Sequence, residues 1–142
     1  MKKSFNTYLV LIQNDKILLH LRHKTGYFDG HYGLVSGHIE DGETALQGII
    51  REAHEEAGIL LNPNNLRMIH VMHRKSDRLN VDFFFECKDW DGTPTNREPE
   101  KCRGLEFFPL DSLPGNTIPY IASFLGGWWR RELGAYSEVG WE

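Results

Sequence analysis

The stretch GHIEDGETALQGIIREAHEEAG, residues 37–58, decides the fold because it specifies a loop that runs into an acidic helix. Apolar residues recur at helical spacing between Ala45 and Ala57, which predicts a helix with one buried face. Asp41 and Thr44 are both suitable caps for the start of this helix. Gly58 suits a left-handed cap at its end.

Three glutamates crowd one face of this helix. Glu52, Glu55 and Glu56 stand at i, i+3 and i+4, where like charges repel, and no basic residue separates them. Arg51 adjoins the cluster, but one guanidinium cannot neutralise three carboxylates. Carboxylate oxygens are the ligands that hard divalent cations prefer, and Mg²⁺ commonly shares its coordination with substrate phosphates. The cluster therefore predicts a Mg²⁺ site, with Mn²⁺ as a substitute.

The fixed positions of the stretch match a known motif. This motif is the Nudix box, here over residues 37–59. It consists of Gly, five residues, Glu, seven residues, Arg-Glu, an aliphatic residue, any residue, Glu-Glu, any residue and Gly followed by an aliphatic residue. The matching residues are Gly37, Glu43, Arg51, Glu52, Glu55, Glu56 and Gly58. The chain thus resembles the Nudix (MutT-type) hydrolase family. The resemblance implies a single domain over residues 1–142, folded as an α/β/α sandwich with a curved mixed sheet.

The resemblance also implies a role for each matching residue. Glu52, Glu55 and Glu56 would bind the metal together with the backbone carbonyl of Gly37. Arg51 would orient a glutamate, and Glu43 would support the loop and the helix, as would Gly58 at the helix end. The general base differs among Nudix enzymes. We take Glu106 as the first candidate. Glu98 and Glu100 in the preceding loop, and a glutamate of the box itself, are the alternatives.

The region after the box narrows the expected substrate. Residues 96–102, followed by Glu106-Phe-Phe-Pro-Leu, resemble Nudix nucleoside-triphosphate pyrophosphatases. This implies hydrolysis of a (d)NTP to a (d)NMP and pyrophosphate. The alternatives are an ADP-ribose or nucleotide-sugar hydrolase and a non-catalytic module that senses a nucleotide. Residues 32–37 read YGLVSG where the family usually has Trp-x-Leu-Pro-Gly-Gly, so the loop geometry and the substrate register are expected to differ.

Candidate substrate-binding residues lie near the glycine-rich segment before the box. Phe28 and Tyr32 are positioned to stack on a base, and Arg22 to contact the substrate. Aromatic residues beside a sheet are more often part of a core, so packing is the alternative role for Tyr27, Phe28 and Tyr32. Trp128, Trp129 and Trp141 are expected to cover the core or to form a homodimer surface. The histidine pairs 20/23 and 70/73 are interpreted as ordinary surface or strand residues.

Composition excludes several other classes. The formal net charge of -4 argues against non-specific binding to nucleic acid or membranes, and favours a small nucleotide partner held through a cation. Cys87 and Cys102 are not spaced like the cysteines of a metal site, so we interpret them as reduced thiols. The N-terminal apolar run is too short and too polar for a signal peptide or a membrane span. Together these features predict a cytoplasmic protein.

Elsewhere short apolar runs alternate with turn signals, a pattern typical of strands. We expect strands over residues 8–12, 17–21, 32–36, 66–73, 81–87 and 105–108, a long loop over 88–101, and a second helix over 118–132 with a weak point at residues 126–127. Strands that surround one early and one late helix predict an α/β sandwich with a mixed sheet.

Overall fold

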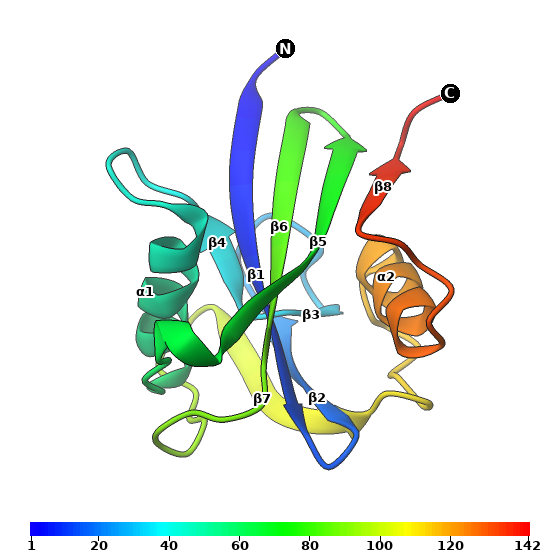
Figure 1. Cartoon of the computed structure of the whole chain (residues 1–142). Helices are drawn as coiled ribbons and strands as arrows, with labels where there is room; N and C mark the ends of the chain where they lie inside the picture. Colours follow the sequence, from blue (N-terminus) through cyan, green and yellow to red (C-terminus); the bar gives the residue numbers. More distant parts are fainter.

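The computed structural model describes residues 1–142 and contains two helices and eight strands (Figure 1). In chain order these are β1 (Lys3–Gln13), β2 (Lys16–Arg22), β3 (Tyr32–Gly33), β4 (Ser36–His38), α1 (Ala45–Ala57), β5 (Leu66–Lys75), β6 (Leu79–Cys87), β7 (Cys102–Pro109), α2 (Pro119–Trp129) and β8 (Tyr136–Val139). A short 3₁₀ turn over Pro63–Asn65 precedes β5. Neither helix has the length and apolar character needed to cross a lipid bilayer.

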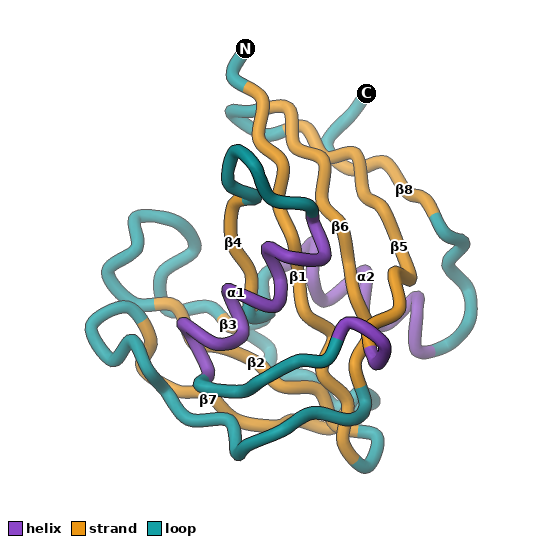
Figure 2. Tube along the Cα trace, turned by 60° about the vertical axis from the view of Figure 1, so that its left-hand side comes forward, coloured by secondary structure: helices purple, strands orange, loops and turns teal.

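The sheet is mixed, as the sequence predicts. Its strand order is β3-β2-β1-β6-β5-β8, while β4 pairs with β1 and β7 pairs with β2. The pairs β1/β6 and β5/β8 are parallel, and the other pairs are antiparallel. Figure 2 shows β1, β6, β5 and β8 running side by side along the sheet.

The two helices cover opposite faces of the sheet, which confirms the predicted sandwich (Figure 1). Side chains alternate between the faces of β1 because successive residues of a strand point in opposite directions. Leu9 and Leu11 belong to the core cluster that includes the buried face of α1. Val10 and Ile12 belong to the cluster that includes α2. Strand β1 is therefore buried on both sides and sets the positions of both helices.

The local signals in the sequence form the structures that they predict. The β1–β2 hairpin turns through Asn14 and Asp15, whose φ angles of 52° and 60° give the left-handed turn that such hairpins favour. Helix α1 begins at the predicted residue after Thr44, which forms a capping box with Gln47. It ends at Gly58, which adopts a φ of 67°.

Three expectations differ from the structure. The single strand expected over 32–36 is wrong: the chain changes partners there, with β3 pairing with β2 and β4 pairing with β1, while Leu34 and Val35 cross between them. The second helix ends at Trp129 because Arg131 takes a positive φ of 59°. The third difference is β8, which was not expected at all. It pairs with β5 through residues far away in the sequence, so local patterning gives little sign of it.

The tryptophans divide between core and surface. Trp128 packs against the core cluster under α2. Trp129 and Trp141 are partly exposed, and the Trp141 indole donates a hydrogen bond to the His73 carbonyl at 3.0 Å. Trp141 thereby ties the C-terminal segment to β5.

The capping box of α1 predicts a measurable loss of stability in a Thr44→Ala variant. The Thr44 hydroxyl accepts from the Gln47 backbone N–H at 3.1 Å, and the Gln47 side chain accepts from the Thr44 N–H at 2.9 Å. Removing this cap should lower the free energy of unfolding by about 1 kcal/mol, measured by urea denaturation. Thr93→Ala is the control, because Thr93 is exposed and lies outside any helix. Equal stability of both variants and the parent would contradict the capping role.

Candidate functional site

Arg51 ties the loop before α1 to the acidic face of the helix. Its Nη2 lies 2.7 Å from Glu43 Oε1, and its Nη1 lies 2.8 Å from Glu52 Oε1 and 2.9 Å from Glu55 Oε2. Nη2 also donates to the His38 carbonyl of β4 at 3.1 Å. The hydrogen bonds that Arg51 donates to the Glu43 carboxylate are the largest cause of the raised pKa of Arg51. One cation therefore positions three carboxylates.

Glu56 is the buried member of the cluster, with 8% of its surface exposed. Desolvation raises the pKa of Glu56 well above its ordinary value, and the neighbouring Glu52 and Glu98 raise it further. The Ser36 backbone N–H partly opposes this by bonding to the carboxylate. A cation beside this buried carboxylate would stabilise its charged form further.

Gly37 lies directly against the end of the Glu52 side chain of α1. A Cβ built at Gly37 would overlap the carboxylate of Glu52. The backbone of β4 and the glutamates of α1 thus form one oxygen-rich group, and such donors fit a hard divalent cation. No three acidic, histidine or cysteine side chains already converge on a single point, and Arg51 holds Glu52 and Glu55.

The long loop over residues 88–101 docks on the end of α1. Its Thr95 and Arg97 backbone N–H groups donate to the carbonyls of Ala57 and Glu56 at 2.9 and 3.1 Å. These bonds satisfy carbonyls that a helix end leaves free. They also bring Glu98 to the acidic face. Burial is the main cause of a raised Glu98 pKa, with Lys101 opposing it and Glu52 adding to it.

A large cleft opens in front of these residues, with a volume of about 840 Å³. The sequence-predicted residues that line it are Arg22, Gly37, Arg51, Glu52, Glu55, Glu56 and Glu98. The far part of the cleft is lined by residues that no motif singled out, among them Tyr8, Arg74, Asn80 and Tyr120.

Glu106 does not join this cleft. It is exposed on β7 opposite Leu19, whereas the next residue of β2, His20, is the one that faces Glu56. Neighbouring residues of a strand point to opposite faces, so Glu106 is on the wrong side of the sheet. It lines a separate hollow of about 490 Å³ together with Trp90.

The predicted aromatic substrate contacts also lie outside the cleft. Tyr32 packs edge-on against Phe108 of β7. Phe28 packs edge-on against Tyr27 and His31. Tyr27, by contrast, lines the cleft and is 39% exposed.

His20 is a site residue that sequence reasoning did not identify. It was interpreted as an ordinary strand or surface residue, and it does lie in a strand, but it is buried with Nε2 3.8 Å from Glu56 Oε1. Burial, followed by the charge of Arg22, lowers the pKa of His20 to about 4. The imidazole is therefore neutral at pH 7. No local signal reveals it, because the contact depends on how β2 packs against α1.

The clustered glutamates of α1, the glycine of β4 packed against them and the cleft lie together on one side of the fold. Residues 3–125 match the family model of the NUDIX domain. The chain belongs to this family.

Relatives and solved structures agree with this assignment. The chain is 27% identical over 104 residues to an ADP-ribose pyrophosphatase of Methanocaldococcus jannaschii, covering 73% of this chain and 61% of that protein. It is 27% identical over 113 residues to the 8-oxo-dGTP diphosphatase of Escherichia coli, covering 78% of this chain and 86% of that protein. It is also similar to the crystal structure of a MutT NUDIX hydrolase from Burkholderia pseudomallei, with a TM-score of 0.81, 23% identity and coverage of 89% and 98% of the two chains. The chain thus spans less than two thirds of the archaeal relative.

The low pKa of His20 predicts that acid destabilises the fold through this residue. The folded-state pKa of about 4 lies below the ordinary 6.5, so the unfolded chain binds more protons between these values. The contribution of neutral His20 to the free energy of unfolding is fully present above pH 6.5 and is lost as the pH falls toward 4. His20→Gln should weaken this acid dependence by about 2 kcal/mol, measured by urea unfolding at several pH values. The exposed His54→Gln is the control, and an unchanged pH profile in His20→Gln would refute the prediction.

Proposed function

We propose that the chain is a divalent-metal-dependent hydrolase that cleaves the pyrophosphate linkage of a nucleoside diphosphate joined to another group. The favoured substrate is a (d)NTP, giving a (d)NMP and pyrophosphate. The observation that carries this proposal is the acidic face of α1, packed against Gly37 and open to the cleft. Such a face meets phosphates only through a cation, because carboxylates and phosphates repel one another.

Glu52, Glu55 and Glu56 are the side chains proposed to hold Mg²⁺ or Mn²⁺, together with the Gly37 carbonyl. When bound, the metal would supply charge stabilisation at the phosphates and would make an attacking water more acidic. Arg51 keeps Glu52 and Glu55 oriented through its two short ion pairs. Glu43 accepts from the Glu40 N–H at 2.9 Å, which closes the loop in front of the helix.

Glu98 is the better placed of the candidate general bases. It lines the cleft, is partly buried and faces the α1 glutamates, and its pKa is raised. A base whose pKa lies nearer neutrality takes a proton from water more readily and still returns it. The side chain of Glu106 is on the other face of the sheet.

The two relatives described above are named for different substrate classes. The archaeal relative is named as an ADP-ribose pyrophosphatase, and the E. coli relative as an 8-oxo-dGTP diphosphatase. The chain covers 86% of the latter and 61% of the former, which supports a nucleoside triphosphate. All three helix glutamates are present, which favours an enzyme over a nucleotide sensor.

The proposed activity predicts release of a nucleoside monophosphate and pyrophosphate that requires a divalent metal. A panel of (d)NTPs, oxidised dNTPs, ADP-ribose and nucleotide sugars would be incubated with Mg²⁺ or with EDTA and the products separated by anion exchange. Glu56→Gln should lower turnover by more than about a hundredfold while the fold is retained. Glu132→Gln, on an exposed ion pair, is the matched control. If nucleotide binds but no compound of the panel is hydrolysed, the result would favour a non-catalytic module that senses a nucleotide.

The two candidate bases are distinguished by paired variants. Glu98→Gln should reduce kcat by about a hundredfold or more and remove the acidic limb of the pH–rate profile. Glu106→Gln should leave both unchanged, because its side chain lies outside the cleft. The reverse result would restore Glu106 as the base.

A further inference from the structure

Strand β8 is an outer strand of the sheet and has one unpaired edge. It is last in the strand order, with β5 on one side and no strand on the other (Figure 1). The Val71 N–H donates to the Ala135 carbonyl at 2.9 Å, and the backbone groups of Ser137, two residues further on, face β5 in the same way. The N–H and carbonyl groups of Tyr136 and Glu138 therefore point away from the sheet. Such an edge is a template for another strand.

The other short or outer strands carry features that discourage pairing, and β8 lacks most of them. Proteins protect sheet edges with charged side chains, proline, bulges or very short strands. Strand β7 pairs only with β2, but it has the exposed charges of Arg103 and Glu106 and ends at Pro109. Strands β3 and β4 contain only two and three residues. Strand β8 has no proline, lysine or bulge, and its single charge, on Glu138, accepts a hydrogen bond from the Tyr136 hydroxyl at 2.8 Å.

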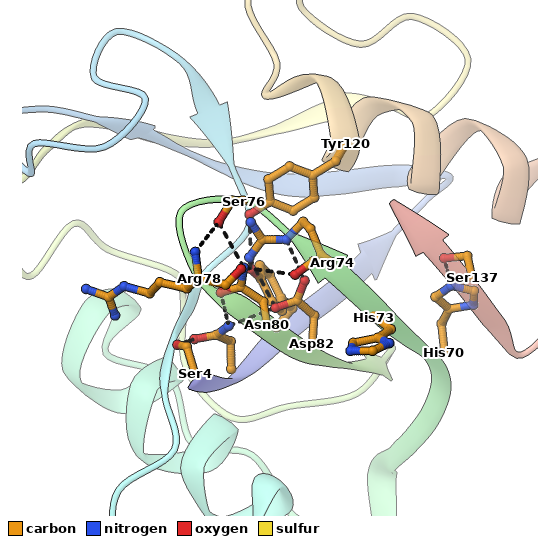
Figure 3. A network of polar contacts seen from close by, with 12 residues as sticks. Ser4, His70, His73, Arg74, Ser76, Arg78, Asn80, Asp82, Tyr120 and Ser137 are labelled. Carbon is orange, nitrogen blue, oxygen red and sulfur yellow. Dashed lines mark hydrogen bonds and ion pairs between the residues drawn. The ribbon is translucent and has the colours of Figure 1, made fainter. Parts of the chain in front are cut away.

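Contacts on the inner side of β8 hold this strand in place. The Ser137 hydroxyl lies 2.7 Å from His70 Nε2, and Figure 3 shows the two side chains together between β8 and β5. After β8 the chain turns at Gly140, which has a φ of 82°. Trp141 then packs on the ring of His73 and donates to its carbonyl at 3.0 Å, so the tail lies over β5. Strand β8 is thus ordered from within, and the tail leaves its outer edge open.

The backbone of this edge is complementary to a second copy of itself. Two identical strands related by a two-fold axis pair antiparallel, and an axis at Ser137 places each Tyr136 opposite the Glu138 of the other copy. These two residues carry the outward backbone groups, and a pair of this kind exchanges two hydrogen bonds. An axis at Tyr136 or at Glu138 would instead place the other residue opposite Gly134 or Gly140, outside β8. The axis at Ser137 therefore uses every outward group of the strand.

The side chains on this edge match in the same register. Tyr136 and Glu138 lie on one face of β8, and the Tyr136 side is 55% exposed. Directly opposite residues of an antiparallel pair have neighbouring side chains. In the paired strands each Glu138 carboxylate would lie beside the phenol hydroxyl of the other copy as well as its own. A donor thus faces an acceptor at both positions, and no two like charges are directly opposite.

We propose that two copies of the chain associate through antiparallel pairing of their β8 strands, with the two-fold axis at Ser137, so that the two sheets become one. The partner that fits this edge is a second copy of the same chain. The strand has four residues and the contact is small, so the dimer is reversible, with a dissociation constant between about 1 µM and 1 mM. This inference does not depend on the proposed hydrolysis, because none of these residues belongs to the acidic face of α1.

The test is sedimentation velocity of the parent chain and of charge variants between about 1 µM and 1 mM. The parent should shift from monomer to dimer over this range. Tyr136→Glu places two carboxylates opposite each other at both positions and should weaken association about tenfold or more, whereas Tyr136→Glu/Glu138→Lys should restore it. Met68→Glu is the matched control, because Met68 is 53% exposed on β5, outside the residues that pair with β8. A parent that stays monomeric, a dimer that survives Tyr136→Glu, or a double variant without recovery would overturn the proposal.

Cross-linking tests the register without relying on charge. Residues that exchange both backbone hydrogen bonds have Cα atoms about 5.5 Å apart, a separation that a disulfide can span. A mixture of the Tyr136→Cys and Glu138→Cys variants, treated with oxidised glutathione, should therefore give more of the mixed disulfide dimer than of either self-linked dimer. Cys87 and Cys102 are buried and do not compete. Mixed and self-linked dimers in statistical proportion would refute the axis at Ser137.

Discussion

The close packing of β4 against the acidic face of α1 is the constraint on which the site depends. A side chain at Gly37 would displace the Glu52 carboxylate, so the observed position of that carboxylate depends on glycine in β4. Arg51 then binds Glu43, Glu52 and Glu55 together and contacts the β4 carbonyl of His38. These ion pairs hold the mutually repelling glutamates in one arrangement that opens to the cleft.

Strand β1 connects this arrangement to the rest of the fold. Its alternating side chains belong to the two core clusters, so α1 and α2 are positioned by the same strand. The cleft runs along one side of that strand, and its lining includes residues of β1, α1 and α2. One part is acidic and contains the three glutamates of α1. The other contains Arg74, which pairs with the buried Asp82.

The 88–101 loop shows how a segment without regular structure acquires a defined place. Its backbone caps the end of α1 through Thr95 and Arg97, and Gly58 leaves room for the Arg97 side chain. Glu98 reaches the cleft as a result. The sequence contained Glu98, Glu100 and Glu106 as candidate bases, and chain position alone could not rank them, since the ranking depends on which face each side chain occupies.

The sequence by itself determined the Nudix box, the bounds of α1 with its caps at Thr44 and Gly58, and the β1–β2 hairpin. These features depend on contacts between residues close together in the chain, and such contacts leave a local pattern. Only the tertiary structure decided the burial of His20 beside Glu56, the pairing of β8 with β5, and the meeting of Tyr27, Arg74 and Tyr120. Those contacts join residues far apart in the sequence, and their geometry exists only after the strands and helices have packed.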